Sequence, residues 1–175
     1  MKSLWSNLFV LVLVLLSVLL FEGGFETTPP APDEAARNQG VTYGVSRVID
    51  GDTVELYKGG ATQTVRLLGI DAPETAYTPT GAECFNEEST AHARQLLEGA
   101  QVVVTTDPSQ DQYDTYDRLL GYITLPDGTD FGAQMLEGGF ATEYTFKGRT
   151  YQRQSVYRQI RVTAEAEGRG MWNCE

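Results

Sequence analysis

Apolar and polar residues alternate along residues 43–49, and four further short stretches rich in apolar and β-branched residues follow, a pattern typical of β-strands. The predicted strands cover residues 43–49, 53–57, 62–70, 101–106 and 119–125. Turn-forming sequences follow the first, second and fifth of them: Asp50-Gly51, Lys58-Gly59-Gly60 and Pro126-Asp127-Gly128. The pattern therefore predicts a domain of short strands that are joined in part by tight turns.

Three further stretches, 86–98, 131–137 and 151–167, predict helices. Asn86 is suited to cap the first helix, and Gly99 follows its end. In the last helix, Val156, Ile160 and Ala164 recur at every fourth position and predict one apolar face. Three strands, a helix, two strands and two helices fit a five-stranded Greek-key barrel of the OB type with three helices, an α+β fold rich in barrel structure.

The amino-terminal 40 residues differ from the rest. Residues 8–21 are apolar apart from one serine, with a lysine before them and glutamates after them, which predicts an export signal. Residues 1–22 are then a signal peptide or a membrane anchor, and the sequence leaves both open. Residues 23–40 contain three prolines and no hydrophobic periodicity, which predicts a flexible linker. Residues 41–175 follow as one domain, expected outside the cell or at its surface.

The chain contains two cysteines, Cys84 and Cys174. An even number behind an export signal favours one disulfide, because exported proteins meet an oxidising environment. Both cysteines also lie outside the predicted core strands. Two unrelated thiols are the alternative.

The charge is unusual for a protein that handles nucleic acid. The whole chain has a formal net charge of −11, and residues 41–175 hold 11 basic and 20 acidic residues. Binding of nucleic acid rests mainly on lysine and arginine, so this balance predicts a weak overall grip. A local pair of arginines beside a bound metal can still hold one phosphate.

Two carboxylates, Asp52 and Asp71, stand where the predicted second strand begins and the third one ends. Adjacent antiparallel strands can bring such ends together, and hard divalent cations prefer carboxylate oxygens. Taken singly, a turn residue and a strand-end cap explain both. Glu74, just beyond, can accept a proton from water, and an exposed loop glutamate is its alternative. Arg66 lies in an apolar strand, so its guanidinium must leave the core or meet a partner.

A divalent cation, a base and a phosphate-binding cation are together the requirements of phosphodiester hydrolysis. Four sequence pieces in order then resemble the staphylococcal nuclease family over about residues 44–172. They are IDGDT at 49–53, RLLGIDAPET at 66–75, the DxYxR pattern at 114–118, and Trp172.

The resemblance assigns roles to individual residues. Asp52, Asp71 and the main-chain carbonyl of Ala72 correspond to the Ca²⁺ ligands of the family, and Glu74 to the residue that activates water. Arg66 and Arg118 correspond to the arginines that contact the scissile phosphate, as planar forks suit phosphate oxygens. A salt bridge with Asp114 or Asp117 is the alternative for Arg118.

The chain departs from the family at several points. Asp117 stands where the family usually has glycine, and its carboxylate is expected to compete with phosphate for the following arginine. The loop 76–83 lacks the lysines of the best-known relative. Tyr144 and Phe146 lie close to the position of two family tyrosines and are expected to stack on a base or sugar, with core packing as the alternative. Asp50 is expected to form the turn or support the metal site, and His92 to be exposed or half-buried.

The sequence and the resemblance together predict an exported, calcium-dependent nuclease. Its substrates are expected to be DNA and RNA, cut with little sequence preference to leave 3′-phosphate ends. The protein is expected to be a monomer that touches a membrane only through an uncleaved amino-terminal segment. A catalytically weak or inactive module that binds nucleic acid or protein is the alternative.

Overall fold

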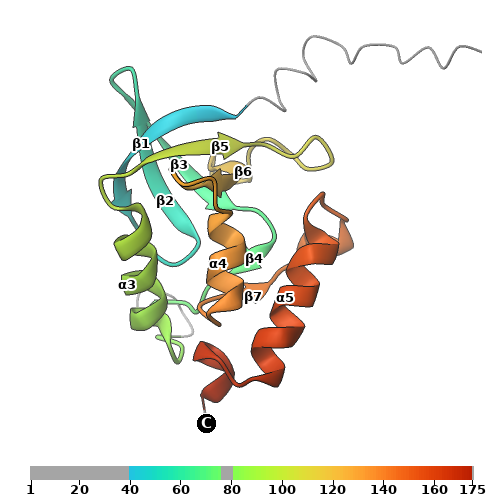
Figure 1. The fold of residues 1–175 in the computed structure, drawn as a ribbon. Coiled ribbons are helices and arrows are strands. Elements are labelled where there is room, and N and C mark those ends of the chain that lie inside the picture. The colour runs from blue at the N-terminus through green and yellow to red at the C-terminus, as the bar shows by residue number, and fades with distance from the viewer. Residues whose placement is uncertain (1–39, 76–80, 175) are drawn as a thin grey trace, which may run out of the picture. The chain divides into compact units, whose positions relative to one another are not determined.

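The computed structural model describes residues 40–75 and 81–174. Five of its strands close into a barrel in the order β1-β2-β3-β6-β5 (Figure 1). They are β1 (Val41–Val48), β2 (Thr53–Lys58), β3 (Ala61–Leu67), β5 (Gln101–Thr105) and β6 (Leu119–Thr124). Neighbours are antiparallel except for β3 and β6, which run parallel. With three helices outside the barrel, the expected α+β fold of the OB type is confirmed.

The predicted third strand does not continue to residue 70. Gly69 has a φ of 79°, a left-handed conformation that interrupts the extended chain. The short β4 (Ile70–Asp71) therefore leaves the barrel and pairs with β7 (Thr142–Glu143). This break places Asp71 outside the barrel wall, on a two-stranded ribbon of its own.

The three helices are α3 (Asn86–Leu97), α4 (Phe131–Glu137) and α5 (Gln154–Ala166), with short 3-10 turns η1 (Phe146–Gly148) and η2 (Gly170–Asn173). The expectation that Asn86 caps α3 is wrong. Phe85 occupies the cap position with a φ of 70°, and the side-chain amide of Asn86 donates instead to the carbonyl of Glu83.

Of the three residues expected on the apolar face of α5, Ile160 and Ala164 are confirmed and Val156 is wrong. Val156 is 56% exposed, whereas Tyr157 and Ala164 are buried and Ile160 packs against the core. The hydroxyl of Tyr157 donates to both oxygens of Asp130, 2.9 and 3.0 Å away, at the start of α4. Because its hydroxyl is satisfied there, a tyrosine takes the buried position that the pattern assigned to valine.

Two predictions concern the ends of the chain. Cys84 and Cys174 form a disulfide with Cα atoms 6.2 Å apart, as expected, and it joins the segment before α3 to the residue after η2. The signal or anchor of residues 1–22 and most of the linker lie outside the described residues. In the part of the chain that is described, no helix has both the length and the apolar character needed to span a bilayer.

Candidate active site

Asp52 stands at the turn between β1 and β2, with 8% of its side chain exposed. Its Oδ1 accepts a hydrogen bond from the hydroxyl of Thr53 at 2.9 Å. Its Oδ2 accepts one from the backbone N–H of Ala72 at 2.7 Å. Because Ala72 directly follows β4, this second bond holds the segment that carries Asp71 against the start of β2.

Arg66, on β3, connects the two predicted metal ligands. Its Nε lies 3.1 Å from Oδ1 of Asp52, and its Nη2 lies 2.7 Å from Oδ1 of Asp71. Its Nη1 donates to the carbonyls of Leu67 and Ile70, at 2.9 and 2.8 Å. The half-buried arginine thus has ion-pair or hydrogen-bond partners for four of its five N–H groups. Among the described residues, one N–H on Nη2 has no acceptor.

The carboxylates around Arg66 are crowded. Burial, and next the charge of Asp52, raise the pKa of Asp50 to about 6. Burial also raises the pKa of Asp71 to about 6, although the Arg66 guanidinium opposes the shift. Oδ1 of Asp50 accepts the backbone N–H of Asp52 at 3.0 Å, so Asp50 forms the turn as expected. The site therefore holds more negative charge than its guanidinium neutralises.

This donor set fits a hard divalent cation such as Ca²⁺. Asp50, Asp52 and Asp71 supply only oxygen donors, and three carboxylates beside one guanidinium leave an excess of negative charge. Among residues 40–75 and 81–174, no three or more His, Cys, Asp or Glu side chains form a metal-holding group by themselves. A cation held by Asp52 and Asp71 would take further ligands from the carbonyl of Ala72, from water or from a substrate.

Glu74 lies just beyond this cluster, and its side chain is exposed. Its negative charge contributes to the raised pKa of Asp71, for which burial is the largest cause. The backbone of Glu74 is clamped by Glu83. The N–H of Glu74 donates to Oε2 of Glu83 at 3.0 Å, and the N–H of Glu83 donates to the carbonyl of Glu74 at 2.9 Å. Glu83 directly precedes Cys84, so the disulfide adjoins this clamp.

Arg118 lies directly before β6, which runs parallel to β3 with Leu119 opposite Val65. Its Nε lies 2.7 Å from Oδ2 of Asp114, so the predicted salt bridge is present, with Asp114 as the partner. Its guanidinium also lies 5.4 Å from the ring centroid of Tyr116. Neither Nη group has a hydrogen-bond partner among the described residues. The two Nη groups of Arg118 are therefore still able to donate hydrogen bonds to phosphate oxygens.

The position of Asp117 predicts that its carboxylate competes with phosphate for Arg118, but its contacts are different. Its φ is 60°, a conformation that costs glycine little, which explains why the family usually has glycine there. Its carbonyl accepts a 3.4 Å hydrogen bond from the side chain of Gln63. The carboxylate that binds Arg118 is that of Asp114 instead.

Tyr144 and Phe146 are 43% and 48% exposed, so the alternative of core packing is wrong. Their ring centroids are 6.3 Å apart. The N–H of Tyr144 donates to the carbonyl of Gly69 at 3.0 Å, which places this segment beside the turn between β3 and β4. Both rings are thus exposed, and their segment lies close to β3 and β4, which carry Arg66 and Asp71.

His92 is half-buried, as expected, and stacks on Phe140 with ring centroids 3.9 Å apart. Burial lowers the pKa of its imidazole. It belongs to the packing between α3 and the end of α4.

Sequence reasoning missed Glu83 as the partner of Glu74. The two residues are separated by eight others, and no local pattern marks such a pair. The contact of Thr53 with Asp52 was also missed. A hydroxyl residue directly after an acid at a strand start could have indicated this hydrogen bond.

The sequence model of staphylococcal nuclease homologues matches residues 64–174. The chain belongs to the staphylococcal nuclease family. It is 28% identical to the thermonuclease of Staphylococcus intermedius over 167 residues, which cover 95% of this chain and 94% of that protein.

Two further relatives support the assignment. The thermonuclease of Staphylococcus hyicus is 28% identical over 159 residues, 91% of this chain and 89% of that protein. An uncharacterized endonuclease of Escherichia coli O157:H7 is 32% identical over 129 residues, 74% of this chain and 75% of that protein. Membership therefore extends across the barrel and the candidate site.

Proposed function

We propose that this member of the staphylococcal nuclease family hydrolyses phosphodiester bonds of DNA and RNA in a calcium-dependent reaction. The observation that supports this most is the pairing of Asp52 and Asp71 through Arg66, with Glu74 on the segment that follows. Arg118, directly before the strand beside β3, adds a second guanidinium whose Nη groups have no hydrogen-bond partner among the described residues. Together these residues supply the acid, base and phosphate-binding groups that the proposed reaction needs.

In the proposed reaction, the carboxylate of Glu74 takes a proton from water, and the water oxygen forms a bond to phosphorus. The bond between phosphorus and the 5′-oxygen breaks, the 5′-oxygen takes a proton from solvent to leave as a hydroxyl, and a 3′-phosphate end remains. The Nη groups of Arg118 and the remaining N–H of Arg66 donate to phosphate oxygens as charge develops. A Ca²⁺ ion held by Asp52, Asp71 and the carbonyl of Ala72 would supply positive charge beside the same phosphate.

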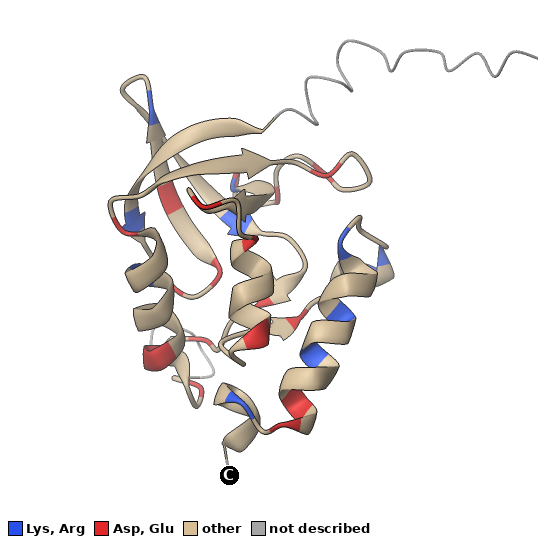
Figure 2. Ribbon diagram, viewed as in Figure 1, with Lys and Arg blue, Asp and Glu red and all other residues tan. Residues whose placement is uncertain are grey.

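Nucleic acid as the substrate is supported by the region that follows β7. Tyr144 and Phe146 offer exposed rings on which bases of any sequence can stack, consistent with low sequence preference. Basic residues also lie along α5 and the turn before it, with acidic residues at the end of the helix (Figure 2). The arginines there pair with carboxylates, as Arg158 does with Glu143 and Arg161 with Glu165, so the support for a nucleic-acid substrate comes from the exposed rings.

An extracellular or cell-surface location is part of the proposal. The disulfide between Cys84 and Cys174 supports it, because such bonds persist in oxidising compartments. The domain is proposed to act as a monomer, behind the linker of residues 23–40.

The test is a cleavage assay on the full chain with a single-stranded oligonucleotide, in Ca²⁺ and in chelator. Glu74→Gln is expected to lower cleavage by about 10²- to 10⁴-fold, the usual contribution of a general base, with an unchanged melting temperature. Glu88→Gln, at an exposed position on α3, is the matched control and should retain activity.

Each possible result decides between the two functions. Calcium-dependent cleavage that is lost only in Glu74→Gln supports the proposed enzyme. Oligonucleotide binding without cleavage, from folded protein, would instead make the chain a binding module.

A further inference from the structure

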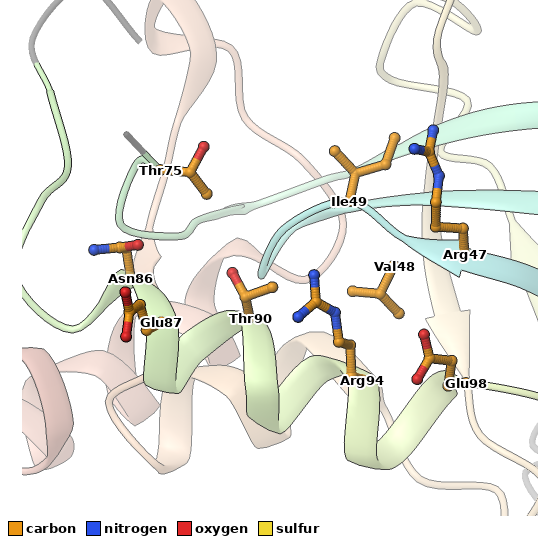
Figure 3. A pocket seen from close by; sticks show the side chains of 9 residues that line it. All are labelled: Arg47, Val48, Ile49, Thr75, Asn86, Glu87, Thr90, Arg94 and Glu98. Atoms are coloured by element: carbon orange, nitrogen blue, oxygen red, sulfur yellow. The ribbon is translucent and has the colours of Figure 1, made fainter. Parts of the chain in front are cut away.

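A pocket of about 880 Å³ lies between the end of β1 and the helix α3 (Figure 3). Val48 and Ile49 line it on the side of the barrel, and Thr90 and Arg94 line it on the side of the helix. None of its lining residues is assigned a role in the proposed reaction. Its chemistry is mixed, with apolar, hydroxyl, cationic and anionic side chains.

The pocket adjoins the candidate active site through two chain segments. Ile49 is followed at once by Asp50 and Asp52, the turn that carries the acidic cluster. Thr75, on another wall, directly follows Glu74. A polymer whose scissile phosphate lies at the acidic cluster therefore meets this pocket next along its length.

Arg94 is the cation that enters the pocket most directly. Figure 3 shows its side chain rising from α3 toward the space between Thr90 and Val48. Within the described residues, the guanidinium of Arg94 has no ion pair or side-chain hydrogen bond, in contrast to Arg66 with its four. Arg47, at the same pocket, lies 3.9 Å from Glu55 with 65% of its side chain exposed, a weak pairing.

Thr90 supplies an independent sign that the pocket takes a polar ligand. The residue is only 6% exposed, and its hydroxyl has no hydrogen-bond partner among the described residues. A buried hydroxyl without a partner costs about 1–3 kcal/mol, so a ligand oxygen at this wall would remove a penalty.

We propose that this pocket is a second phosphate-binding subsite, which holds a phosphodiester of the nucleic-acid strand next to the cleaved bond. Arg94 donates to the phosphate oxygens, the hydroxyl of Thr90 lies at the base, and the exposed side chain of Ile49 packs on the neighbouring sugar. This inference rests on the proposed function, because it takes the strand to run through the acidic cluster.

Two carboxylates also line the pocket and limit what it binds. Glu87 lies toward the start of α3 and Glu98 toward its end, with Arg94 between them in Figure 3. They disfavour a freely diffusing anion, since their charge opposes that of the arginine. A phosphate that is anchored on the same strand at the active site is favoured, because its local concentration is high.

The test uses the full chain with Glu74→Gln, so that binding is measured without cleavage. Fluorescent single-stranded oligonucleotides of two and eight nucleotides are titrated in Ca²⁺ over a series of salt concentrations. Arg94→Gln is expected to weaken binding of the longer strand by roughly tenfold. It should also reduce the salt slope, which is the slope of the logarithm of affinity against the logarithm of salt concentration, by about 0.7, the value for one phosphate contact on a single strand. Binding of the dinucleotide should be unchanged.

Three further variants serve as controls. Arg161→Gln removes an arginine that is paired with Glu165 on α5, 2.6 Å away, and should leave both affinities unchanged. Arg94→Lys keeps the charge and should preserve the salt slope. Thr90→Val should leave the ligand-free protein at least as stable and still weaken binding of the longer strand, a combination that a purely structural role does not produce.

An unchanged salt slope in Arg94→Gln, or equal losses for both strand lengths, would overturn the subsite. Inorganic phosphate is titrated against the bound longer strand as a further arm. Displacement at micromolar phosphate that depends on Arg94 would assign the pocket to a free anion and overturn the strand proposal. Cleavage by the chain with Glu74 intact is measured separately, so a failure of the enzyme is distinguished from a failure of the subsite.

Discussion

Asp52 and Asp107 are the buried acids among the residues that the structure describes, and their surroundings differ. Asp107, two residues beyond β5, is 3% exposed. It accepts hydrogen bonds from the hydroxyls of Tyr122 and Ser109, at 2.6 and 2.7 Å, and from the N–H of Gln152 at 2.7 Å. Burial alone would raise the pKa of Asp107, but these donors outweigh it and lower the pKa below its ordinary value of 3.8.

The acids around Arg66 show the opposite balance. Burial and neighbouring charges raise the pKa of Asp50 and Asp71 to about 6, because one guanidinium serves several carboxylates. A buried acid that is surrounded by donors, such as Asp107, favours the folded state in its charged form. Acids that crowd each other, such as Asp50 and Asp71, cost stability in their charged form, which makes their cluster a candidate for binding a cation. Asp107 differs from them in its partners, which are hydrogen-bond donors rather than other acids.

The largest effect on the free energy of unfolding is expected when the guanidinium of Arg66 is removed. Arg66→Gln leaves the buried Asp52 without its charge partner and should destabilise the protein by about 3–5 kcal/mol in chelator, as urea unfolding would measure. Arg118→Gln breaks a more exposed pair, with side chains 30% and 18% exposed, and should cost at most about 1 kcal/mol. Equal losses in the two variants would contradict the distinction.

Calcium should act on one acidic region and not on the other. At a hundredfold excess over its dissociation constant, Ca²⁺ is expected to stabilise the wild-type protein by about 2.7 kcal/mol. Asp71→Asn should abolish this gain, while Asp107→Asn should retain it. Thermal melts with and without chelator measure this stabilisation. A calcium-dependent rise in melting temperature that persists in Asp71→Asn would place the ion elsewhere.

The third effect is the contribution of Asp107 to folding stability and its loss at low pH. Asp107→Asn keeps the shape but loses charge-assisted hydrogen bonds, and should cost about 1–3 kcal/mol at pH 7. Because the folded pKa of Asp107 is lowered, its stabilisation is present above pH 3.8 and is lost as pH falls through the folded value. The difference between wild type and variant in urea unfolding should therefore shrink below about pH 3.8. A constant difference from pH 7 to pH 2 would contradict this.

The smallest effect on stability is expected at Glu83, an exposed acid that holds the backbone of Glu74. Glu83→Ala removes the acceptor and should change the free energy of unfolding by less than about 0.5 kcal/mol, as surface substitutions do. It should lower kcat by several-fold to about tenfold through misplacement of Glu74, with KM little changed. Glu88→Ala provides the control, and an unaltered kcat in Glu83→Ala would show that the clamp has no part in catalysis.

Much of the fold follows from local patterns. Alternation in the first stretch, short apolar runs in the others and turn residues between them predict all five barrel strands, because strand faces and turns each favour particular residue types. The same reasoning failed at Gly69, which reads as part of a strand until its neighbours are known. A Cβ at Gly69 would lie 2.5 Å from the ring of Tyr151, a contact that no sequence window contains. The burial of Tyr157 in place of Val156 has the same origin, since it depends on Asp130, the residue before α4.

Residue type and short spacing are enough to predict the strands, to favour the disulfide and to pick out the residues whose chemistry suits phosphodiester hydrolysis. The folded chain is needed to see that Arg66 is shared by two aspartates, that Asp114 pairs with Arg118, and that Glu83 holds Glu74. It also decided which buried acids are satisfied. Hydrogen bonds and ion pairs act over about 3 Å, and the folding of distant segments sets which groups come that close.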